Sequence, residues 1–195
     1  LALAEVPFET ALVDRTARSQ LRPEYLALNP NGLIPVLETP EGPIFETAAI
    51  LLWLSGRYPQ AGLELDGPGT GWLVWMSNAL HPALRMIFYP HSLPPAQGLH
   101  AAGMARAAAL YDIAEARLPA APLLDCYLCP MLRWSVLYPV GGPRWFDLDR
   151  WPRLASRARD FEDIPAIAEA CNAEGLGPAP FTAPRPAAPP EGSAT

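Results

Sequence analysis

The chain has 195 residues, half of them hydrophobic, which suffices for one large domain or two small ones with a sizeable core. Its net charge of −6 gives no electrostatic basis for nucleic-acid binding, and no apolar run approaches the length of a membrane span. Three cysteines do not build a disulfide framework, so we expect a reducing, cytoplasmic location. The opening Leu-Ala-Leu-Ala has no basic leader and does not resemble a signal peptide.

The first 28 residues are predicted to contain a helical segment, a strand and a polar connection. Residues 1–6 are helix-like and end at Pro7. Residues 8–13 have the composition of a strand, whereas residues 15–28 are polar and connecting, with a helical turn at Arg22-Pro23-Glu24.

Residues 29–58 carry the most specific pattern in the chain. After an Asn-Pro-Asn-Gly turn, an apolar strand is predicted at residues 33–37, with Pro35 inside it at an edge or bend. The turn Glu-Thr-Pro-Glu-Gly-Pro then leads to a second strand at Ile44 and Phe45. We expect Thr47 to cap a helix over residues 48–58, which Pro59 ends.

The rest of the chain is predicted to be helical. Residues 60–71, rich in Gly and acidic side chains, read as a linker, and strand signals fade from Trp72 onward. The tail has six prolines in residues 178–195 and is expected to be extended or disordered. Apolar periodicity predicts helices that include Trp72, Trp75, Met76, Ala79, Leu80 and Ala83; residues 96–118, with a stripe of Ala102, Ala105, Ala109, Ile113 and Ala116; residues 123–138; residues 151–159; and residues 165–173.

This order of elements resembles the cytosolic glutathione S-transferase family, and in particular its bacterial beta class. The resemblance is carried by Asn29–Tyr58 and extends through Asp149–Leu154 and Pro165–Ile167. It implies an α/β plus all-α fold, with a thioredoxin-like glutathione-binding domain at residues 1–59 and a helical bundle domain at residues 72–175. The linker would then be residues 60–71, and residues 176–195 the tail.

The resemblance also implies a glutathione site. In the family, the proline that matches Pro35 is cis, and the backbone of the residue before it, here Ile34, pairs with the cysteinyl part of glutathione. Glu46 and Thr47 match the acidic and hydroxyl pair at a helix start, which receives the γ-glutamyl end. Taken alone, Thr47 is better explained as the cap of an ordinary core helix.

The chain departs from the family in three places. Members open with a strand and a loop that carries the thiol-activating Tyr, Ser or Cys, whereas Leu1 falls inside the first helix. We therefore expect a thioredoxin-like domain truncated at its start, with impaired conjugation and lower stability. Pro122 replaces the Ser or Thr of a capping box that precedes Asp125, and Leu33 replaces a basic residue.

Two further features leave alternatives open. His81 matches a histidine that faces the thiol in beta-class enzymes, but it is equally explained as a satisfied histidine beside a proline kink; His91 and His100 receive no role. Cys126 and Cys129 form a Cys-x-x-Cys inside a predicted buried helix, which favours a core role over redox or zinc chemistry, and no metal is expected.

The resemblance implies a dimeric detoxification enzyme that conjugates glutathione to a small hydrophobic electrophile. Trp75, Leu80 and Leu84 are expected to line the electrophile pocket. Two alternatives remain: a non-catalytic binding or scaffold protein with the same fold, and a glutathione-dependent isomerase.

Overall fold

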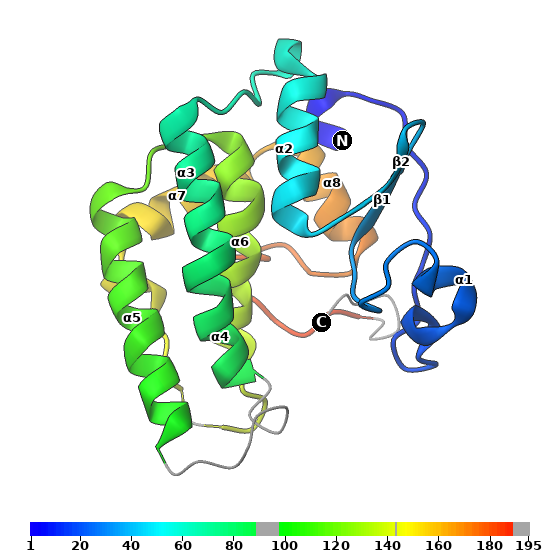
Figure 1. Cartoon of the computed structure of the whole chain (residues 1–195). Coiled ribbons are helices and arrows are strands. Elements are labelled where there is room, and N and C mark those ends of the chain that lie inside the picture. The colour runs from blue at the N-terminus through cyan, green and yellow to red at the C-terminus, as the bar shows by residue number, and fades with distance from the viewer. Residues whose placement is uncertain (89–97, 143, 189–195) are drawn as a thin grey trace.

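The computed structural model describes residues 1–88, 98–142 and 144–188. Figure 1 shows a small α/β part, made by the first 60 residues, beside a bundle of helices. The elements are α1 (Pro23–Leu26), β1 (Val36–Thr39), β2 (Gly42–Phe45), α2 (Thr47–Arg57), α3 (Gly67–Trp75), a π-helical turn (Met76–Leu80), α4 (His81–Phe88), α5 (Leu99–Arg117), α6 (Pro122–Leu137), α7 (Pro152–Glu162) and α8 (Pro165–Ala173), with short 3₁₀ turns between some of them.

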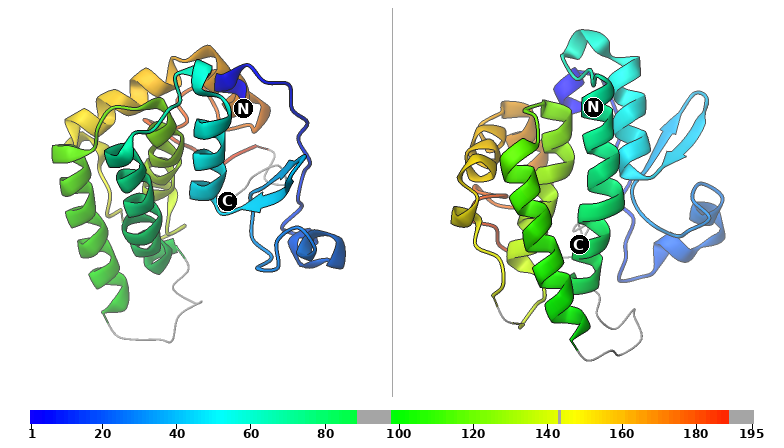
Figure 2. Two further views of the ribbon diagram at one scale, coloured as in Figure 1. Left: turned by 45° about the horizontal axis from the view of Figure 1, so that its top comes forward. Right: turned by 60° about the vertical axis from the view of Figure 1, so that its left-hand side comes forward.

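The predicted strand–turn–strand–helix unit is confirmed, but β1 begins at Val36, so Pro35 precedes the strand instead of lying inside it. β1 and β2 pair antiparallel, with Val36 opposite Phe45 and Thr39 opposite Gly42. The Thr39 hydroxyl donates to the Gly42 carbonyl at 2.7 Å and closes the turn. In Figures 1 and 2, α2 lies between this hairpin and the bundle, while α1 lies at the outer edge of the molecule.

The strand predicted at residues 8–13 is wrong. This segment makes no ladder with the hairpin, and the sheet in the described residues consists of β1 and β2. The side chains of Phe8 and Leu12 are 48% and 69% exposed. A strand is stable only where a neighbour accepts its backbone hydrogen bonds, and here none pairs with it.

One continuous helical segment supplies a large part of the apolar core of the bundle. α3, the π-helical turn and α4 follow one another without a break, and they pack on α5 and α6. The predicted spacing of apolar residues from Trp72 to Ala83 is confirmed. Leu73, Met76, Leu80, Leu84 and Ile87 have no exposed surface. α6 lies at the centre, as predicted, against α2, α3, α4 and α7.

The predicted stripe on α5 does not face the core. Its members, Ala102 through Ala116 at the spacing given above, are exposed. The buried face instead consists of Gly103, Ala107, Leu110, Tyr111 and Ala114. In an alanine-rich helix several faces are equally apolar, so the larger Leu110 and Tyr111 decide which face packs.

The described part of the tail is ordered against the bundle, contrary to expectation. Arg133 on α6 is only 3% exposed and donates to the carbonyls of Pro180 at 3.0 Å and Arg185 at 2.7 Å. The Glu162 carboxylate accepts from the N–H of Phe181, whose ring is buried against the core. Composition misses this because polar anchors, rather than apolar periodicity, hold the segment.

Helices α6 and α7 are joined by a nearly buried ion pair. The Arg157 Nε donates to Asp125 Oδ1 at 2.8 Å, and its Nη1 donates to the carbonyls of Leu118 and Pro119. Burial raises the pKa of Asp125 to about 6, because the loss of hydration outweighs the attraction of Arg157.

Within the described ranges, no helix is both long and apolar enough to cross a bilayer.

Candidate functional site

The end of the hairpin that leads into α2 brings predicted ligand residues together. Since Val36 pairs with Phe45, Ile34–Pro35 and Glu46 leave the sheet at the same end. The Ile34–Pro35 bond is cis, which confirms the expectation from the resemblance. No described residue bonds the N–H or the C=O of Ile34, so both groups are open to a bound peptide.

Side-chain hydrogen bonds hold the loop before Ile34 in place. The carbonyl of Leu33 accepts from the Tyr25 hydroxyl at 2.9 Å and from the Asn29 amide at 2.7 Å. Asn29 is 2% exposed, and its side-chain oxygen also accepts from the Asn31 N–H. These bonds hold the backbone at Ile34 in place without using its own polar groups.

The start of α2 is exposed, and its capping differs from the prediction. Thr47 is the first helical residue and Glu46 is the N-cap, with no side-chain cap bond from either. The helix begins one position earlier than predicted, so the Thr47 hydroxyl is not placed to cap it. Glu46 has a φ of 72°, which is uncommon outside glycine and recurs at binding sites.

The open start of α2 suits an anion. The first intrahelical bond runs from the Ile50 N–H to the Glu46 carbonyl at 3.0 Å. The N–H groups of Thr47, Ala48 and Ala49 precede it and lack carbonyl partners, as at any helix start. A ligand carboxylate placed here gains both these donors and the helix dipole.

His81 lies where the π-helical turn meets α4. Pro82 follows it and has no N–H to donate, and a wide turn of this kind accommodates such a gap. The His81 Nδ1 is 2.9 Å from the Tyr127 hydroxyl on α6, and the Trp134 ring lies 5.6 Å from the imidazole. Burial, with a smaller contribution from Arg85, lowers the pKa of His81, so the ring is neutral at pH 7.

Tyr127 connects the bundle to the α/β part of the molecule. It is 4% exposed, hydrogen-bonds to His81 and Ser77, and lies within the electrostatic reach of Glu46. Burial is the main cause that raises the pKa of its hydroxyl. Sequence reasoning missed Tyr127; the available signal was a hydroxyl-bearing aromatic residue within a mostly apolar helix.

The expected pocket lining is only partly accessible. Leu80 and Leu84 have no exposed surface and belong to the core, so they do not line an open pocket, while Trp75 is half-buried. The aromatic side chains around His81 come instead from α4 and α6. Phe88 contacts Trp134 at 6.4 Å and Tyr138 at 5.2 Å between ring centroids.

The cysteines are packing residues. Cys126, Cys129 and Cys171 are free thiols, and burial raises the pKa of each of them, to about 11 for Cys126 and Cys171. Cys171 is 7% exposed. Among the described residues, no three His, Cys, Asp or Glu side chains gather to hold a metal ion. His91 lies outside the described residues.

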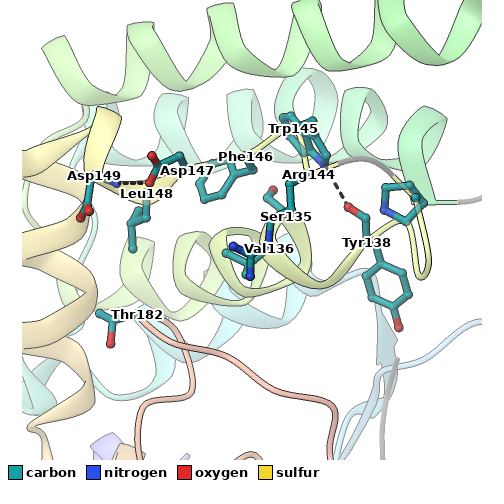
Figure 3. A pocket seen from close by; sticks show the side chains of 12 residues that line it. Ser135, Val136, Tyr138, Arg144, Trp145, Phe146, Asp147, Leu148, Asp149 and Thr182 are labelled. Carbon is teal, nitrogen blue, oxygen red and sulfur yellow. Dashed lines mark hydrogen bonds between the residues drawn. The ribbon is translucent and has the colours of Figure 1, made fainter.

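A separate cavity lies under the loop that follows α6. It has a volume of about 200 Å³ and is lined by residues that include Ser135, Tyr138, Asp147 and Thr182 (Figure 3). The Trp145 indole N–H donates to the Tyr138 carbonyl across its rim at 2.9 Å. None of the site residues predicted from the sequence lines this cavity.

Comparisons with known proteins agree with this geometry. Residues 1–57 match the family described as Glutathione S-transferase, N-terminal domain. A glutathione S-transferase named GST-4.5, from Xanthomonas campestris pv. campestris, is 29% identical over 148 residues, which are 67% of this chain and 72% of that protein. Several other curated transferases are matched over less than two thirds of their own length.

Two further matches bear on fold and function. The structure of a sphingomonad glutathione S-transferase complexed with glutathione superposes with a TM-score of 0.73 and 25% identity, covering 90% of this chain and 92% of that one. Elongation factor 1-gamma from Prunus avium is 47% identical over 64 residues, which are 33% of this chain and 12% of that protein. The expected fold class, a thioredoxin-like α/β part followed by a helical bundle, is confirmed. Residues 1–57 therefore carry the N-terminal domain of the glutathione S-transferase family, and the chain as a whole has the fold of that family.

Proposed function

We propose that this protein binds glutathione and conjugates it to small hydrophobic electrophiles. The proposal is supported by three groups: the unpaired backbone of Ile34, the open start of α2, and the His81–Tyr127 pair, in which Tyr127 lies within the electrostatic reach of Glu46. The first two groups suit a peptide ligand with a terminal carboxylate. The third offers a neutral imidazole next to a cluster of aromatic rings.

Each part of glutathione has a partner in this arrangement. The Ile34 N–H and C=O pair with the cysteinyl backbone, while the helix start at Thr47 receives the γ-glutamyl carboxylate. The exposed Glu46 carboxylate holds the adjacent ammonium. The glutathione thiol loses its proton to solvent, and His81 stabilises the resulting thiolate by donating a hydrogen bond to it. The thiolate sulfur then forms a bond to the electrophilic carbon, and the bond from that carbon to its leaving group breaks.

Binding is tested by titrating glutathione calorimetrically into the full chain and into the Glu46→Gln and Thr47→Ala variants. We expect Glu46→Gln to weaken binding by about tenfold, the range for a lost charge-assisted hydrogen bond. Glu41→Gln, an exposed carboxylate in the hairpin turn, is the matched control. Equal affinity in Glu46→Gln and Thr47→Ala would reject the assignment of these ligand residues.

Thr47→Ala is a clean binding probe because its side chain makes no cap bond. We expect its free energy of unfolding to change by less than about 0.5 kcal/mol. Any loss of glutathione affinity then reports on the ligand contact rather than on helix stability. Conjugation itself is followed by the absorbance of the thioether formed from glutathione and a chlorodinitrobenzene.

The non-catalytic alternative is favoured by one observation, the 47% identity to a stretch of elongation factor 1-gamma. On that proposal the fold serves as a binding or scaffold module. Glutathione binding without thioether formation, across several electrophiles, would favour this second function. Isomerisation of a substrate with glutathione regenerated would instead favour the glutathione-dependent isomerase.

Three further expectations belong to the same proposal. We propose a cytoplasmic location, a role in detoxification and a homodimeric state, as is common in the family. Sedimentation of the full chain at several concentrations measures the oligomeric state directly.

A further inference from the structure

We propose that Tyr127 is a positioning residue whose hydroxyl donates a hydrogen bond to Nδ1 of His81, so that the imidazole carries its proton on Nε2. The functional consequence of this inference rests on the proposed thiol chemistry, whereas the tautomer itself does not. Tyr127 and His81 are 46 residues apart and come from α6 and α4.

The contact is short, shielded and well oriented. The Nδ1–Oη distance is 2.9 Å, and the two rings meet edge to face, with centroids 5.8 Å apart and planes at 78°. Tyr127 is 4% exposed, so bulk water competes poorly for its hydroxyl. Trp134 flanks the same imidazole at 5.6 Å and limits its rotation.

The direction of the bond follows from the chemistry of the two groups. Both partners are neutral at pH 7, because burial lowers the pKa of His81 and raises that of Tyr127. A phenol is the stronger acid of the pair and an imidazole nitrogen the stronger base, so O–H to N is the favoured arrangement. Ser77 is a second partner of the Tyr127 oxygen and can donate its own hydroxyl proton there.

The tautomer decides what His81 offers to a bound thiol. With Nδ1 accepting from Tyr127, Nε2 carries hydrogen and can donate to a thiolate. In the opposite tautomer, Nε2 would present a lone pair to the sulfur and repel it. Tyr127 therefore acts through His81 and needs no contact with the substrate.

The first test reads the tautomer without glutathione. The chain has three histidines, so the imidazole ¹⁵N spectrum of the whole protein is simple, and His81→Gln assigns the relevant signals. We expect Nε2 to be protonated and Nδ1 to be unprotonated at neutral pH, and a mixture of tautomers in Tyr127→Phe. Protonated Nδ1 in the wild type, or an unchanged tautomer in Tyr127→Phe, would overturn the proposal.

Tyr111→Phe is the matched control. Its hydroxyl is also buried, donates to the Met131 carbonyl at 3.2 Å and lies 2.8 Å from the Ser135 hydroxyl, but it does not touch His81. We expect the wild-type His81 spectrum in this variant. If Tyr127→Phe does not fold, the wild-type spectrum alone still decides the tautomer.

The second test measures the consequence for the thiol. With glutathione bound, the thiolate absorbance against pH gives the thiol pKa. We expect about fivefold less thiolate at neutral pH in Tyr127→Phe, the range for one hydrogen bond, and no change in Tyr111→Phe. An unchanged thiol pKa in Tyr127→Phe would overturn the positioning role. Failure of the wild type to bind glutathione would reject the proposed function and leave the tautomer result standing.

Discussion

The helical bundle and the α/β part of this protein are stabilised to different extents. The bundle buries Leu73, Leu80, Leu84 and Tyr111 completely and joins α6 to α7 through a nearly buried ion pair. The first 60 residues bury few apolar side chains, and their sheet has two strands. Yet the unpaired backbone of Ile34 and the open start of α2 lie in this less buried part. Ligand sites commonly lie in such regions, because a polar group that is already hydrogen-bonded within the protein is not available to a ligand.

The largest loss of stability is expected from a change at Arg157 in the bundle. Arg157→Met leaves Asp125 without its cation in a largely buried place, since the two side chains are 11% and 14% exposed. We expect a loss of about 3–5 kcal/mol in the free energy of unfolding at neutral pH, measured by urea denaturation.

Arg150→Met is the control for that measurement. Its partner Asp112 and Arg150 itself are 52% and 56% exposed, and such pairs contribute at most about 1 kcal/mol. Equal losses in the two arginine variants would contradict the view that burial sets the cost.

A smaller but clear effect is expected from cavities in the two regions. Leu84→Ala removes a fully buried side chain from α4 and should cost about 3 kcal/mol. Leu12→Ala in the amino-terminal segment truncates a side chain that is 69% exposed and should cost less than about 0.5 kcal/mol. Thermal unfolding of both variants makes the comparison, and a similar fall in Tm would show that the two regions are equally packed.

The third effect concerns pH and is of similar size to that of Leu84→Ala. The pKa of Asp125 is raised from 3.8 to about 6, so the folded state binds this proton more tightly than the unfolded chain does. Its contribution to stability is therefore fully present below about pH 4 and lost as the pH rises through about 6, a change of roughly 3 kcal/mol.

Asp125→Asn removes this titration, so the difference in stability between wild type and variant isolates it from other groups. We expect the wild type to lose stability relative to Asp125→Asn between about pH 4 and pH 6.5. A difference that stays constant with pH would mean that Arg157 fully compensates the burial of the carboxylate.

Much of the backbone geometry around Ile34 and Glu46 could be predicted from the sequence because its signals are local. These signals are the turn at residues 29–32, the proline after Ile34 and the Glu-Thr pair before an apolar helix. Each acts on neighbouring residues, so it can be recognised in the sequence alone. The hairpin predicted in this way is confirmed, as is the cis bond at Pro35 that the family resemblance implies. The exact helix start was not, since a one-residue shift moved Thr47 out of the capping position.

By itself, the sequence determined the order of elements, the hairpin that presents Ile34 and Glu46, and the apolar helix at the centre of the bundle. Only the tertiary structure decided which face of α5 packs, how Arg133 and Glu162 hold the tail, and that Tyr127 meets His81. The physical reason is how far apart the interacting residues lie in the sequence. Turns, caps and apolar periodicity arise between residues a few positions apart, whereas these contacts join side chains at least 19 positions apart, and only packing of the whole chain brings them together.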